Sequence, residues 1–128
     1  MGVAEMLARA GCRVRLAVNG YVPGQRIQQY VRDQGNGTLH KLGVEVIPYA
    51  RLYGADGDTV YLQHMSSGEP IICEGVDTVV LALGHEQETA LAEALAGWPG
   101  ELHRIGDCVA PRTAEEAVLE GLKVASAL

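Results

Sequence analysis

Apolar residues near the start of the chain recur at the spacing of an α-helix. Four of them share one face of a helix over residues 1–11: Val3, Met6, Leu7 and Ala10. Gly11 suits the position just after a helix end, where a left-handed backbone is common. Residues 13–18 then alternate Arg-Val-Arg-Leu-Ala-Val, which predicts a strand. Because an apolar helix face needs a sheet beneath it, this order predicts a βαβ unit whose first strand is cut off or supplied from elsewhere.

The middle of the chain changes from helical to two-residue periodicity. Residues 25–34 predict a second helix, which Gly35-Asn36-Gly37 is expected to interrupt before Thr38 caps a further turn. Residues 44–48 predict a strand. Three shorter strands follow, joined by Gly-containing turns of the hairpin type, at residues 50–53, 59–65 and 71–74. We therefore expect an antiparallel β-meander beside a parallel sheet.

The longest apolar run, residues 76–83, is nearly continuous, as in strands that are buried on both faces. It ends at Gly84, and a helix is expected from there to about residue 96. Residues 101–105 predict the last strand and residues 113–128 the last helix. The inward face of that helix is expected to hold six residues: Ala117, Val118, Gly121, Leu122, Val124 and Ala125. The fold class that follows is α/β, with a parallel sheet, flanking helices and a small antiparallel β-meander.

The end of the last predicted strand carries the clearest candidate chemistry. Gly106 allows a sharp turn after Ile105, and Asp107 then places a carboxylate at the carboxyl edge of the sheet, where ligands bind in open α/β folds. Thr113 is a good N-cap for the helix that follows. Together they offer an acceptor for a ligand hydroxyl and free amide N–H groups for a ligand anion. The alternative is an ordinary strand-to-helix turn without a ligand.

Composition and charge narrow the possible partners. The 128 residues suffice for one domain with a core, and because Phe is absent, Val, Leu, Ile and Ala must build it. A net charge of −6 argues against nucleic acid or an anionic membrane as a partner. No apolar run approaches the roughly 20 residues of a membrane span, and no secretory signal is visible. The three cysteines form no metal pattern, so we expect a cytoplasmic protein without a metal site.

Other side chains with reactive groups have simpler interpretations. His85 follows the Gly84 turn at a strand's carboxyl edge, so it is a candidate ligand contact as well as a surface residue. His64 is expected on the surface of the meander. Cys108 is interpreted as a small packing residue, because the adjacent Asp107 carboxylate opposes a thiolate. Five acids are expected to be helix-start or surface charges: Glu86, Glu88, Glu115, Glu116 and Glu120.

Several stretches of the chain resemble one group of flavoproteins. The sequence DTVVLALG at residues 77–84, followed about twenty residues later by RIGD at residues 104–107, resembles the closing segment of flavoproteins with two dinucleotide-binding domains. The continuation at residues 110–125 looks like the C-terminus of the trimethylamine dehydrogenase, histamine dehydrogenase and 2,4-dienoyl-CoA reductase group. Residues 2–11 are similar to the helix after that group's internal dinucleotide fingerprint. The resemblance covers nearly the whole chain and is strongest over residues 76–128.

The resemblance implies a Rossmann-like FAD/NAD(P)-binding fold with two incomplete nucleotide-binding parts. Residues 1–74 correspond to a partial NAD(P)-type dinucleotide-binding subdomain that lacks its first strand and includes the β-meander. Residues 75–128 correspond to the C-terminal part of the FAD- or ADP-type domain. Asp107 then matches the carboxylate that accepts ribityl or ribose hydroxyls. The expected cofactor-binding residues are Gly84, His85, Gly106, Asp107, Thr113, Ala114 and Glu115.

The activity that the resemblance implies belongs to a larger enzyme. In such enzymes an N-terminal barrel carries FMN, an iron–sulfur cluster and the substrate site, and the partner region holds a second nucleotide. We expect the intact enzyme to use FAD or ADP together with NAD(P)H. This chain alone is expected to hold no bound cofactor, to contain no catalytic residue and to be inactive.

Two departures from the family pattern keep other functions open. The Gly-x-Gly of a dinucleotide fingerprint is absent together with its strand, and Val18-Asn19-Gly20 carries no acid for a ribose 2′-hydroxyl. One alternative is a non-catalytic ADP-binding or subunit-docking domain. Another is a homodimer in which a neighbouring chain supplies the missing strand.

Overall fold

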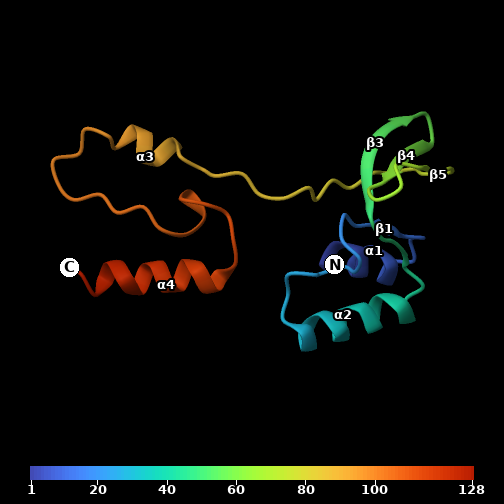
Figure 1. Cartoon of the computed structure of the whole chain (residues 1–128), viewed down its shortest axis with the longest axis horizontal. Coiled ribbons are helices and arrows are strands. Elements are labelled where there is room, and N and C mark those ends of the chain that lie inside the picture. Colours follow the sequence, from blue (N-terminus) through green and yellow to red (C-terminus); the bar gives the residue numbers. More distant parts are fainter. The chain divides into compact units, whose positions relative to one another are not determined.

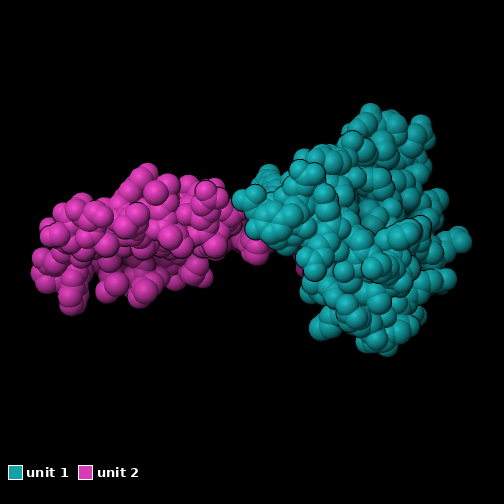
Figure 2. All heavy atoms as spheres, turned by 90° about the horizontal axis from the view of Figure 1, so that it is seen from below, with its two compact units in different colours: residues 1–79 teal, residues 80–128 magenta.

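The β-strands of this protein all lie in the first 79 residues. A computed structural model describes residues 1–128, and it divides into unit 1, residues 1–79, and unit 2, residues 80–128 (Figure 2). Unit 1 contains every strand and two helices, whereas unit 2 contains two helices and one 3₁₀ turn. The assignment of residues 1–74 and 75–128 to NAD(P)-type and FAD-type parts stays a prediction.

The first half of unit 1 alternates helix and strand, as the sequence predicts. Helix α1 (Gly2–Arg9) is followed by β1 (Arg15–Ala17), and α2 (Gln29–Lys41) is followed by β2 (Glu45–Ile47) (Figure 1). Strands β1 and β2 pair in parallel. Gly11 has a φ of +88°, the left-handed backbone expected just after the end of α1.

A small core holds the two helices on this parallel pair. Its buried residues are Ala4, Leu39 and Val44. The predicted inward face of α1 is therefore wrong in part, because Val3 and Met6 are 50% and 61% exposed and the small Ala4 faces the core instead.

Helix α2 differs most from its prediction. It begins at Gln29 and continues through residues 35–37 to Lys41, so the expected interruption does not occur. Each helical Gly costs about 1 kcal/mol relative to Ala, but the Asn36 side chain donates hydrogen bonds to the carbonyls of Pro23 (3.0 Å) and Arg32 (2.9 Å). Thr38 does not cap a new turn, since its hydroxyl donates to the Gln34 carbonyl inside the helix.

The predicted β-meander is confirmed. Strands β3 (Ala50–Asp56), β4 (Thr59–His64) and β5 (Pro70–Cys73) form an antiparallel sheet in that order. Its alternating inward residues make a second core of Ala50, Val60, Leu62 and Cys73. Strand β3 is longer than expected because it continues past a register shift between Leu52 and Gly54, which is a β-bulge.

Neither of the two strands predicted after residue 75 is present. Residues 76–83 are not a strand, and the side chains of Val80, Leu81 and Leu83 are 54%, 61% and 79% exposed. Residues 101–105 form no strand either. A strand needs a hydrogen-bonded neighbour to be stable, and the apolar pattern alone does not say which segment that neighbour is. The predicted helix over residues 85–96 is reduced to α3 (Ala90–Ala94).

The last helix is confirmed, but its orientation was only partly predicted. Helix α4 (Ala114–Ala125) follows Thr113 as expected. Ala117 and Gly121 are half-buried, whereas Val118 and Leu122 are 71% and 62% exposed and do not face inward.

The α/β class is thus confirmed, with a small parallel sheet and a three-stranded antiparallel sheet. A Rossmann-like sheet stays a prediction. None of the helices combines the length and the apolar character that crossing a membrane requires.

Candidate functional site

The candidate site is built around a single 3₁₀ turn, Gly106–Cys108, that follows an extended residue. Ile105 has φ −143° and ψ 161°, and Gly106 then reverses to a φ of +66°. A left-handed backbone disfavours any residue with a Cβ. A Cβ on Gly106 would also lie 3.4 Å from the Cβ of Ala117 on α4. The positive φ therefore favours glycine at this position, and the turn lies in contact with α4.

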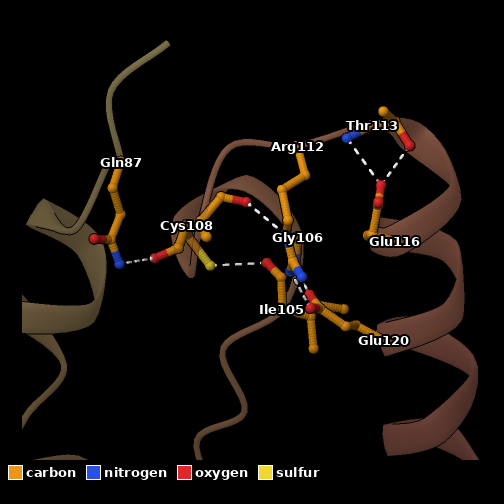
Figure 3. A network of polar contacts seen from close by, with 9 residues as sticks. Gln87, Ile105, Gly106, Cys108, Arg112, Thr113, Glu116 and Glu120 are labelled. Atoms are coloured by element: carbon orange, nitrogen blue, oxygen red, sulfur yellow. Dashed lines mark hydrogen bonds and ion pairs between the residues drawn. The ribbon is translucent and has the colours of Figure 1, made fainter. Parts of the chain in front are cut away.

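Helix α4 reaches back to the turn through Glu120 (Figure 3). The Gly106 N–H donates a hydrogen bond of 2.7 Å to Oε2 of Glu120, and Arg112 donates to its Oε1. The Gly106 amide, and next the Arg112 guanidinium, hold the pKa of Glu120 below its ordinary value. The carboxylate thus joins the turn, the loop before α4 and α4 itself.

The Cys108 carbonyl is a second fixing point of the turn. It accepts a hydrogen bond from Gln87 Nε2 at 2.7 Å (Figure 3). It accepts a second one from Arg104 Nη2 at 2.9 Å. The Cys108 thiol donates to the Ile105 carbonyl at 2.9 Å, which agrees with its interpretation as a packing residue. Gln87 thereby attaches the segment that follows His85 to the turn.

The start of α4 is capped by its own third residue. The Glu116 carboxylate accepts hydrogen bonds from the Thr113 N–H, at 2.9 Å, and from the Thr113 hydroxyl (Figure 3). The hydrogen bond from the Thr113 hydroxyl is the main cause that lowers the pKa of Glu116. One of the amides that we expected to be free for a ligand anion is therefore already paired.

The remaining predicted residues lie at the surface. Asp107 is exposed, and its carboxylate takes part in no hydrogen bond or ion pair within the chain. Ala114 and Glu115 line an open hollow of about 460 Å³ together with Val118, Leu119 and Leu122. Gly84, with a φ of +130°, and His85 are exposed.

The structure thus places five of the predicted residues on the turn or at the start of α4, which the Gly106–Glu120 hydrogen bond joins: Gly106, Asp107, Thr113, Ala114 and Glu115. It shows no polar contact from Gly84 or His85 to the turn, which only Gln87 reaches. The role of each residue in binding a cofactor stays a prediction.

Sequence reasoning missed the residues that hold the turn in place. Glu120 was interpreted as a surface charge, which is wrong, because its side chain is 25% exposed and has two partners. A usable signal was its position directly before Gly121 and three residues after Ala117, since small residues mark a helix face that a backbone can approach closely.

One expectation in unit 1 also changes. His64 is half-buried rather than on the surface, because its ring packs 5.8 Å from that of Tyr49 and its Nδ1 accepts the Ser67 N–H at 3.1 Å. Tyr49 itself holds a φ of +52°, which is unusual for a residue other than glycine.

The fold of this chain is found again in solved structures of larger enzymes. No protein-family model matches the sequence, and neither does any curated protein sequence. The chain is similar over 98% of its length to histamine dehydrogenase from Rhizobium sp. 4-9, with 24% identity and a TM-score of 0.86. It is similar over 94% of its length to 6-hydroxypseudooxynicotine amine oxidase from Pseudomonas geniculata N1, with 24% identity and a TM-score of 0.81.

A third solved structure is 2-naphthoyl-CoA reductase in complex with 2-naphthoyl-CoA. It has 26% identity and a TM-score of 0.78 over 94% of this chain. The resemblance to the trimethylamine dehydrogenase and 2,4-dienoyl-CoA reductase group is thereby confirmed, since all three proteins are members of that group. The chain spans only 21%, 19% and 18% of the three proteins, in the order given.

Proposed function

We propose that this chain is the C-terminal nucleotide-binding part of a flavin-dependent oxidoreductase. The observation that carries the proposal is the exposed, unpaired Asp107 carboxylate, which directly follows the buried Gly106. A carboxylate fixed at the end of an extended segment is suited to accept hydrogen bonds from ligand hydroxyls. The likeness to three oxidoreductases, an amine oxidase, a dehydrogenase and a reductase, supports the same class.

The charges of the site favour one portion of the ligand over another. Asp107, Glu115 and Glu116 are all acids, and the nearby Arg112 is already paired with Glu120. A phosphate would be repelled here, whereas a ribityl or ribose hydroxyl would donate to Asp107 without a charge conflict. The residues present therefore fit the sugar-like portion of FAD or ADP.

In the intact enzyme a bound flavin would supply the redox chemistry, exchanging electrons with NAD(P)H. The residues of this chain would bind and orient the nucleotide. Asp107 would accept a hydroxyl hydrogen bond, the Gly106 turn would keep that carboxylate in place, and the apolar hollow beside Ala114 would contact an uncharged portion of the ligand. No residue of this chain is assigned a catalytic role.

Titration of the purified chain with FAD, ADP and NADPH, followed by calorimetry and flavin fluorescence, tests this proposal. We expect no copurified flavin, and weak saturable binding of FAD or ADP that Asp107→Asn reduces by about tenfold, the effect of losing one charged hydrogen bond. Asp56→Asn, an exposed charge in unit 1, is the matched control. Binding that is unaffected by Asp107→Asn would contradict the site, and no binding of any of the three would favour a docking role.

A docking role is the second candidate, and the exposed apolar side chains of unit 2 favour it. They include Val80, Leu81, Leu83, Leu91, Val118 and Leu122, each of which is more than half exposed. Apolar surface of this kind marks contact with another protein or domain, for which the catalytic FMN barrel is the candidate. Alternatively, the open edges of the β1–β2 pair could bind a strand from a second copy. Light scattering that shows a dimer would support this arrangement, and a strict monomer would exclude it.

A further inference from the structure

The N–H of Gly106 has one hydrogen-bond acceptor in the structure, the side chain of Glu120. Gly106 is buried, and a buried N–H without an acceptor is costly. The acceptor is not a backbone carbonyl but Oε2 of Glu120, fourteen residues further along the chain. An ionised acceptor makes the stronger kind of hydrogen bond.

Small residues on α4 leave room for this contact. The position of a Cβ on Gly106 lies 3.4 Å from Ala117, and that of a Cβ on Gly121 lies 3.7 Å from Cδ1 of Ile105. Residues 117 and 121 are one helical turn apart and share a face, and Glu120 adjoins that face. The extended residue and the turn therefore lie directly against α4, within reach of the Glu120 carboxylate.

We propose that Glu120 is a positioning residue for Asp107, and that Arg112 in turn holds Glu120. The Asp107 side chain has no hydrogen bond of its own, so no side-chain contact holds it, and its place is set by the backbone that continues directly from Gly106. Glu120 fixes that backbone by accepting the Gly106 N–H, and Arg112 fixes the second carboxylate oxygen. This inference rests on the proposed function, in which Asp107 contacts the ligand.

Replacing the Glu120 carboxylate by the amide of Gln tests the two hydrogen bonds of this side chain. In Glu120→Gln one end of the side chain accepts hydrogen bonds and the other donates them. If the oxygen faces Gly106, the NH₂ faces the Arg112 guanidinium, and two donors oppose each other. If the side chain is reversed, the NH₂ opposes the Gly106 N–H. Either orientation loses one of the two contacts, and replacing Arg112 by Met removes the conflict in the first.

The experiment compares five forms of the full chain: wild type, Glu120→Gln, Arg112→Met, the double variant and Glu86→Gln as an exposed charge-matched control. Hydrogen exchange of the Gly106 amide and the NMR signals of Asp107 report on the turn without any ligand. We expect exchange at least about tenfold faster in Glu120→Gln, a partial return in the double variant, and no change in the control. Recovery on adding a second substitution distinguishes positioning from a general loss of fold.

Titration with FAD and with ADP gives the functional readout. We expect Glu120→Gln to weaken binding by roughly tenfold and the double variant to recover part of that loss, in parallel with the Gly106 exchange. Unchanged Gly106 exchange and unchanged Asp107 signals in Glu120→Gln would overturn the positioning role, whatever the ligand data show. If wild type binds neither nucleotide while the exchange data follow this pattern, Glu120 still sets the turn and only the proposed function fails.

Discussion

Unit 1 buries seven apolar residues in two clusters, and unit 2 buries none. In unit 1 the alternation of each strand is matched by a neighbouring strand, so its apolar side chains have a sheet or a helix to pack on. In unit 2 the apolar side chains of residues 80–83 and of Val118, Leu119 and Leu122 on α4 are exposed. The turn in unit 2 is held instead by hydrogen bonds. Glu120 accepts the Gly106 N–H, and Gln87 and Arg104 donate to the Cys108 carbonyl.

The two kinds of contact differ in how much they stabilise. Burying one Leu or Val side chain contributes about 1.5–3 kcal/mol, whereas a typical intramolecular hydrogen bond contributes about 0.5–1.5 kcal/mol net. Unit 1 therefore has its own source of stability. Unit 2 has no buried apolar cluster, so its local geometry depends on the weaker polar contacts.

A matched pair of leucine substitutions should give the largest difference between the units. Leu39 in α2 is 1% exposed, so Leu39→Ala should lower the free energy of unfolding by about 2–5 kcal/mol. Leu122 in α4 is 62% exposed, and Leu122→Ala should change it by less than about 0.5 kcal/mol. Urea unfolding followed by circular dichroism measures both. Equal losses in the two variants would mean that unit 2 contains a core after all.

Hydrogen exchange should show the same contrast residue by residue. Amides of β4, the central strand of the meander, should exchange only on global unfolding of unit 1. Amides in the middle of α4 should exchange at least about 100-fold faster, because local opening exposes little new apolar surface there. NMR-detected exchange at neutral pH measures the two sets in one sample. Comparable protection in α4 and β4 would contradict the comparison.

Acid should affect unit 2 before unit 1, and this is the smallest of the expected effects. The pKa values of Glu116 and Glu120 are held below the ordinary 4.5 by hydrogen bonds that only the folded chain offers. Their stabilisation is therefore fully present above about pH 4.5 and is lost as the pH falls through the lower folded-state pKa values. Amide chemical shifts of Gly106 and Thr113 should move in that acid range, while those of β4 stay constant. Shifts that move at or above pH 4.5 would contradict the assignment.

The parts of the fold that local patterns determine were predictable. The spacing of apolar residues gave α1, and alternation with hairpin turns gave the meander, since both depend on neighbours in sequence. The absence of a strand at residues 76–83 was not predictable in this way. A buried strand depends on a neighbouring strand, which the apolar sequence of these residues does not specify. Helix α2 continues through residues 35–37, where the Asn36 side chain contacts the Pro23 carbonyl. Helix propensities describe single residues and do not include such a tertiary contact.

In the candidate site too, features with a local sequence pattern were predictable and features that depend on a tertiary contact were not. Gly106, Asp107 and Thr113 were identifiable because a turn and a helix cap have local signatures. Glu120 was not, because an acid on an amphipathic helix has the same pattern whether it faces water or a buried amide. Only the approach of Gly106 to Ala117 distinguishes the two cases, and that approach is a tertiary contact.

The close contact at Gly106 also constrains how this sequence can change. A larger residue at 117 would push the turn away from α4, and the Glu120 carboxylate would then lose the Gly106 amide. A side chain at 106 would meet Ala117 while also adopting a disfavoured φ. Positions 106, 117 and 120 therefore form one coupled unit in any variant library, where tolerated changes at one of them depend on simultaneous changes at the others.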